Sequence, residues 1–100
     1  MVDVRKVIDT EVYDTETADR IYTIADDVGE ISLDGNVDRT ALYRTKKGRW
    51  FIAGESGANG RWRKRGQNNR YEAGEGLELL TPEQADKYLD EMAALDVIEG

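Results

Sequence analysis

Two neighbouring runs near the middle of the chain restrict its fold most strongly. Residues 40–45 and 49–53 are rich in aromatic and β-compatible side chains, and Lys46-Lys47-Gly48 between them is a short glycine-containing link. This pattern predicts an antiparallel β-hairpin. With 100 residues in all, the chain has room for one domain of ordinary size around that hairpin, over residues 1–100.

Residues 15–28 have the spacing of an amphipathic helix. The side chains at positions 18, 21, 22, 25 and 28 are apolar, which gives one stripe over about three turns. Asp14 can cap the first turn, and Gly29 is a natural end. We therefore predict a first helix here.

A second helix has a clear start. Thr81 can act as the N-cap, Pro82 suits the first helical position, and Gln84 completes a Thr-x-x-Gln capping box. The apolar stripe expected to face the core consists of Ala85, Tyr88, Leu89, Met92 and Leu95.

The remaining segments predict short strands and turns. Strands are expected over 4–9, extended by Val12-Tyr13, and over 61–65, 70–73 and 77–80, with loops over 30–38 and 54–60. The sequence thus predicts an α+β domain: an antiparallel β-meander of about four to five strands, with two helices packed on one face.

The charged residues are segregated along the chain. Residues 1–43 have a net charge of −7, residues 44–71 of +8 and residues 72–100 of −8, within a total of −7. Such segregation creates a strong local field and indicates a binding surface rather than a catalytic cleft.

The acidic residues of the first flank suggest mimicry of nucleic acid. On a helix, residues 16–30 would span about 21 Å and carry one carboxylate per roughly 4–5 Å, close to the ~3.4 Å between phosphates of a DNA strand. The candidate partner-binding acids are Asp14, Glu16, Asp19, Asp26, Asp27, Glu30, Asp34 and Asp38. Alternatively, acids on a solvent-facing helix only keep a small protein soluble.

The basic segment offers a second candidate surface. An aromatic residue among cations suits phosphate contact combined with base stacking. The residues are Arg61, Trp62, Arg63, Lys64, Arg65 and Arg70. They could contact nucleic acid, contact an acidic protein, or simply neutralise the acids of the same molecule, and Trp62 could belong to the core.

Four motifs resemble a mostly uncharacterised family of small proteins carried on prophages, plasmids and integrative elements of bacteria. They are Tyr13-Asp14-Thr15-Glu16-Thr17-Ala18, the run 42–52 (LYRTKKGRWFI), Gly54-Glu55-Ser56-Gly57-Ala58, and Leu80-Thr81-Pro82-Glu83-Gln84-Ala85. The resemblance covers about residues 5–92 and implies an origin on a mobile element. Small acidic proteins from that setting include anti-CRISPR inhibitors, some of them similar to DNA in surface charge. The segment 61–65 is more basic than that family pattern.

Enzymatic function is not expected. The chain has no histidine and no cysteine, which excludes Ser-His and Cys-His nucleophile systems and the usual transition-metal ligands. Asp34, Asn36 and Asp38 have the spacing of a calcium loop, but Arg39 stands where its glycine belongs. We predict no cofactor and no metal.

These observations predict a non-catalytic inhibitor whose acidic helices bind a basic, nucleic-acid-binding surface of a host defence complex such as CRISPR–Cas. The alternative is a small regulatory module that binds nucleic acid or an acidic protein through the basic hairpin 61–70. The chain has neither the apolar stretch of a signal peptide nor a run of about 18 apolar residues. We therefore expect it in the cytoplasm of the bacterial host cell, away from membranes.

Overall fold

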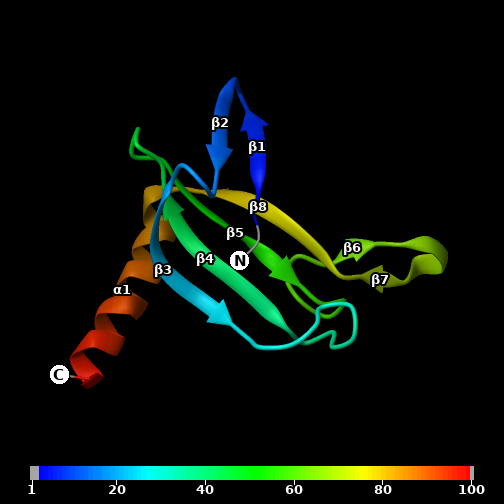
Figure 1. Ribbon diagram of the computed structural model, residues 1–100. Coiled ribbons are helices and arrows are strands. Elements are labelled where there is room, and N and C mark those ends of the chain that lie inside the picture. Colours follow the sequence, from blue (N-terminus) through cyan, green and yellow to red (C-terminus); the bar gives the residue numbers. More distant parts are fainter. Residues whose placement is uncertain (1–2, 100) are drawn as a thin grey trace.

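A four-stranded antiparallel sheet forms the centre of the molecule (Figure 1). The structure, a computed structural model, describes residues 3–99, with residues 95–99 described as backbone only. The strands of the sheet are β3 (Asp19–Asp26), β4 (Asp38–Arg44), β5 (Trp50–Ser56) and β8 (Gly74–Leu80), in the spatial order β3-β4-β5-β8. The predicted α+β class and antiparallel sheet are confirmed.

Two smaller hairpins and one helix complete the fold. The hairpins are β1 (Arg5–Ile8) with β2 (Glu11–Asp14), and β6 (Lys64–Arg65) with β7 (Tyr71–Glu72); the helix is α1 (Pro82–Glu99). Within the described residues no helix is long and apolar enough to cross a membrane.

The predicted helix over residues 15–28 is wrong, because this segment contains β3. The antiparallel register between β3 and β4 shifts between Arg20 and Tyr22 and again between Thr23 and Ala25, so Ile21 and Ile24 are extra residues. Each bulge resets the two-residue alternation of a strand. Apolar side chains therefore recur at a helix-like spacing along a strand.

Asp14, expected to cap a helix, accepts the hydrogen bonds of a single turn only. Its carboxylate accepts a hydrogen bond from the Glu16 backbone N–H at 2.9 Å, and its carbonyl accepts one from the Ala18 N–H at 3.0 Å. The chain then enters β3 instead of continuing as a helix. Aromatic and β-branched residues such as Ile21, Tyr22 and Thr23 favour a strand once a partner strand is present.

One face of the sheet packs against the β1–β2 hairpin. Phe51 is fully buried, stacks on Tyr43 at a centroid distance of 5.1 Å, and meets the edge of Tyr13 at 5.8 Å. The buried cluster consists of Val4, Tyr13, Ala41, Tyr43, Phe51, Ala53 and Leu77. A hairpin thus covers this face, where no helix lies within the described residues.

Helix α1 covers part of the opposite face. Thr81 and Gln84 exchange the two hydrogen bonds of the predicted capping box, at 2.9 and 3.2 Å, and the helix begins at Pro82 as expected. Ala85 is fully buried, and a groove beside Tyr88 is also lined by sheet residues such as Ile52. Leu95, expected in the buried stripe, has a side chain outside the described residues.

Two strand predictions in the basic middle need correction. The strand β5 continues to Ser56, so the expected loop over 54–60 begins later. The predicted strand over 61–65 is reduced to Lys64–Arg65, which pairs with β7 rather than with the central sheet. The middle of the chain therefore forms a separate two-stranded projection.

Candidate functional site

The β6–β7 hairpin projects away from the sheet (Figure 1). Lys64 is opposite Glu72 and Arg65 is opposite Tyr71 in the antiparallel register. The turn η1 (Gln67–Asn69) closes the tip. Residues 63–72, which we call the basic ribbon, carry four cations and one acid, a net charge of +3. A chain of total charge −7 therefore presents a positive projection.

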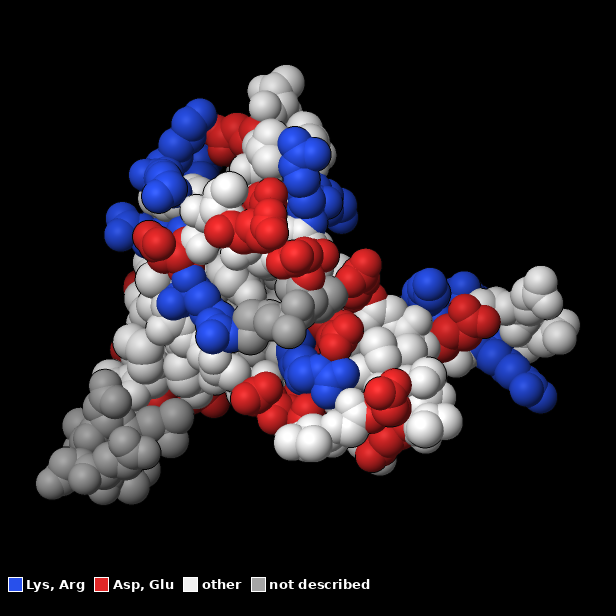
Figure 2. Space-filling model, in the orientation of Figure 1, with Lys and Arg blue, Asp and Glu red and all other residues white. Residues whose placement is uncertain are grey.

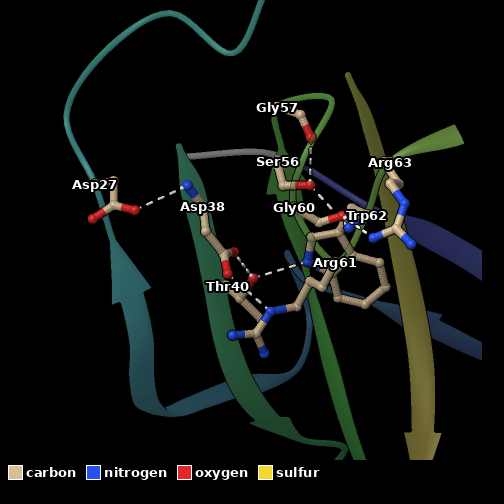
Figure 3. Close-up of polar contacts among 9 residues, drawn as sticks. All are labelled: Asp27, Asp38, Thr40, Ser56, Gly57, Gly60, Arg61, Trp62 and Arg63. Atoms are coloured by element: carbon tan, nitrogen blue, oxygen red, sulfur yellow. Dashed lines mark hydrogen bonds and ion pairs between the residues drawn. The ribbon is translucent and has the colours of Figure 1, made fainter. Parts of the chain in front are cut away.

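Trp62 anchors the base of the basic ribbon to the sheet. Its indole Nε1 donates a hydrogen bond to the Thr40 hydroxyl at 2.8 Å, and its backbone N–H donates one to Ser56 Oγ at 2.9 Å (Figure 3). The indole also lies close against Gly76, where a Cβ atom would be 2.6 Å from the ring. Only a residue without a side chain leaves room for the ring in this position.

Carboxylates extend this anchor to the neighbouring loop. Asp38 accepts a hydrogen bond from Arg61 Nε at 2.9 Å, and its second oxygen accepts one from the Thr40 hydroxyl (Figure 3). The Asp38 backbone N–H in turn donates to the Asp27 carboxylate at 3.1 Å. Thr40 thus links the indole of Trp62 to a carboxylate that holds Arg61. Contacts to the strands β4, β5 and β8 therefore hold the base of the ribbon.

The side chains of the basic ribbon differ in how they are held. The Arg63 guanidinium lies 4.7 Å from the centroid of the Tyr71 ring, and Arg65 donates to Asn69 Oδ1 at 2.9 Å. Lys64 and Arg70 are exposed, and neither side chain has a hydrogen bond or ion pair to any residue within 3–99. Figure 2 shows basic side chains on both margins of the projection and an uncharged tip. The two unpaired cations are available to an anionic partner.

The six predicted basic residues therefore do not form one uniform surface. Arg61 and Trp62 belong to the anchor, and the side chains of Arg63 and Arg65 make contacts within the ribbon or at its base. The side chains of Lys64 and Arg70 make no hydrogen bond or ion pair with the described part of the chain. The sequence alternative placed Trp62 in the core; its indole contacts the sheet, but the side chain is only partly buried and lies outside the buried cluster.

The eight predicted acidic residues are not brought together on one helix face. Asp14, Glu16 and Asp19 lie near the start of β3, whereas Asp26, Asp27, Glu30, Asp34 and Asp38 lie in or beside the loop from β3 to β4. Asp19 and Asp26 pair with Arg44 and Arg39 of β4, so they are separated by roughly 17 Å. Several of these carboxylates also have partners: Asp14 lies 3.9 Å from Arg5, and Asp34 accepts from the Asn36 N–H.

Sequence reasoning missed three residues of this site. Thr40 and Ser56 hold Trp62, and Gly76 makes room for it. The run Gly74-Glu75-Gly76 contained a usable signal, since glycine inside a strand often marks the close approach of another group. The Thr40 hydroxyl had no comparable signal, because it lies 22 residues from Trp62 in the sequence.

Among residues 3–99 no three acidic side chains converge in a way that could hold a metal ion. No protein-family model, curated protein or solved structure matches the chain. The geometry and charge of the basic ribbon are therefore the basis for a functional proposal.

Proposed function

We propose that this protein is a non-catalytic module that binds nucleic acid through the basic ribbon, residues 63–72. The observation that carries the proposal is a projection held at its base by hydrogen bonds, whose exposed cations, Lys64 and Arg70, have no side-chain partner among the side chains that the structure describes. Exposed cations on a fixed scaffold are the groups that contact phosphates, and they position a protein on its nucleic-acid partner.

The overall negative charge does not oppose this proposal, because the field near the ribbon is set locally. Charges separated by more than about 8 Å are largely screened at physiological ionic strength. The ribbon has a net charge of +3, and its base is neutralised where Arg61 meets Asp38. A polyanion that approaches the projection therefore meets cations first.

The ribbon composition favours nucleic acid over an acidic protein. Besides cations it presents the amide side chains of Gln67, Asn68 and Asn69. Amides complement the donors and acceptors of base edges. An acidic protein would offer carboxylates to the cations but no base edges to the amides.

Mimicry of nucleic acid by an acidic helix, and with it inhibition of a defence complex, stays a prediction. Its structural premise was a helix over residues 15–28, and this segment contains β3. The acids lie in two groups at opposite ends of that strand. We therefore place the basic ribbon ahead of the acidic residues as the binding surface.

The experiment is a salt titration of binding to a fluorescently labelled duplex DNA, followed by anisotropy. Replacing Lys64 and Arg70 together by alanine should weaken binding and reduce the slope of log K against log[salt] by about 2, since each phosphate contact contributes about 0.9. The matched control is the double replacement Lys46→Ala and Lys47→Ala, which removes the same charge from an exposed loop outside the ribbon.

We expect the control variant to bind like the wild type. Equal losses in both variants would show that the ribbon is not the contact surface. The absence of salt-dependent binding by the wild-type protein to any nucleic acid would overturn the proposal.

A further inference from the structure

We infer that the basic ribbon enters the major groove of double-stranded B-DNA tip first, and that Asn68 and Asn69 contact base edges there with a preference for adenine. This inference rests on the proposed function and specifies its ligand. It follows from the dimensions of the ribbon, from the distribution of charge and from the chemistry of the tip.

The dimensions of the ribbon fit the groove. A two-stranded β-ribbon can enter the major groove of B-DNA, which is about 12 Å wide and about 8.5 Å deep. The paired part of the ribbon runs from Lys64–Glu72 to Gly66–Arg70, roughly 7 Å at about 3.3 Å per residue, and the turn 67–69 extends it further. The projection is therefore about as long as the groove is deep.

The charge distribution favours entry by the tip. The ribbon carries +3 and the whole chain −7, which leaves −10 for the remaining residues. A DNA duplex lying flat across the rest of the molecule would bring its phosphates near the acids of the loop from β3 to β4, Asp34 among them. Tip-first insertion places phosphates beside the ribbon cations instead.

The tip offers uncharged amides between flanking cations. Gln67, Asn68 and Asn69 are exposed, and the Asn68 side chain has no partner within residues 3–99. The Oδ1 atom of Asn69 accepts a hydrogen bond from Arg65, which orients its amide. An asparagine or glutamine amide can pair with N6 and N7 of adenine in the major groove.

Other nucleic acids fit less well. The major groove of A-form RNA is too deep and narrow for side chains to read. Single strands are bound mainly by several aromatic side chains on which bases stack. Tyr71 is the one aromatic residue of the ribbon, and the Arg63 guanidinium lies over its ring.

The first test compares a duplex DNA, its separate strands and an RNA duplex of the same sequence in competition at constant salt. The inference expects the DNA duplex to bind most tightly. Replacing adenine by 7-deazaadenine, which lacks the N7 acceptor of the major groove, should weaken binding. Equal or tighter binding of single strands or RNA would overturn the inference, as would binding that is insensitive to 7-deazaadenine.

The second test removes the amides and preserves the turn. Asn68 and Asn69 have φ values of 56° and 59°, and glycine adopts this left-handed region without strain. In the double variant Asn68→Gly, Asn69→Gly, a preference of about fivefold or more for adenine-containing duplexes should disappear, while the salt slope stays unchanged. A preference that persists in this variant would contradict the assignment of the tip.

The two proposals can fail separately. Binding that depends on Lys64 and Arg70 but does not distinguish DNA duplexes from single strands or RNA supports the proposed function and refutes the major-groove inference. Failure of every nucleic acid to bind refutes both.

Discussion

The contact between Trp62 and Gly76 can be tested by a double-mutant cycle. In the variant Gly76→Ala, the new Cβ would lie 2.6 Å from Cε3 and 3.0 Å from Cζ3 of the indole, so the ring must move. That movement breaks the 2.8 Å hydrogen bond from Nε1 to Thr40, worth about 1 kcal/mol, and adds about 1–3 kcal/mol of overpacking. Alanine is itself about 0.5–1 kcal/mol more favourable than glycine in a strand, and this gain offsets part of the loss.

We therefore expect Gly76→Ala alone to lower the free energy of unfolding by roughly 1–3 kcal/mol. In a Trp62→Ala background the same change should be neutral or slightly stabilising, because the three atoms nearest the new Cβ all belong to Trp62. The cycle should thus give a coupling free energy of about 2 kcal/mol.

Urea denaturation of the four proteins measures this coupling, and thermal melts provide a check at about 4–8 °C per kcal/mol. Additive effects, with equal losses from Gly76→Ala in both backgrounds, would refute the anchor as described. If the anchor also orients the basic ribbon, Gly76→Ala should weaken DNA binding at temperatures where the variant remains folded.

Two further predictions concern the β1–β2 hairpin and the core that it covers. Thr10 has a φ of 68° in the two-residue turn of this hairpin, a conformation that is strained for a β-branched residue. Thr10→Gly should therefore raise the free energy of unfolding by up to about 1 kcal/mol. A free energy of unfolding below that of the wild type in urea denaturation would contradict the assigned turn. Burial raises the pKa of the Tyr43 hydroxyl above its ordinary value, so the folded state favours its neutral form. The contribution of Tyr43 to the free energy of unfolding should therefore be constant below about pH 10 and be lost above it, because this hydroxyl ionises first in the unfolded chain. Tyr43→Phe should reduce this alkaline loss in denaturation curves recorded at increasing pH, and an identical loss in the variant would show that Tyr43 is not its source.

Features fixed by residues close in sequence were predicted correctly. The hairpin link Lys46-Lys47-Gly48 joins β4 to β5, and the capping box at residues 81–84 starts the helix. Both depend on backbone hydrogen bonds and turn conformations that a few consecutive residues determine. The composition of the basic ribbon was likewise visible in the sequence, because charge is a property of each residue.

The error at residues 15–28 has a physical cause. An isolated helix and a doubly bulged strand place apolar residues at the same spacing, and sequence periodicity alone does not separate them. Pairing with β4 decides between the two, since β4 provides the backbone partners that the bulged strand needs. The acids between residues 16 and 30 were consequently predicted on or near one helix face, and they lie instead towards the two ends of a strand.

Local sequence was sufficient to predict the antiparallel central hairpin, the start of the C-terminal helix and the basic character of the middle segment. Which cations are paired depends on contacts between distant segments. Arg61 is neutralised by Asp38, which is 23 residues away, and Trp62 is held by Thr40 and Gly76. Such contacts form only when β4, β5 and β8 pair and bring distant side chains within hydrogen-bonding distance, so no local pattern encodes them.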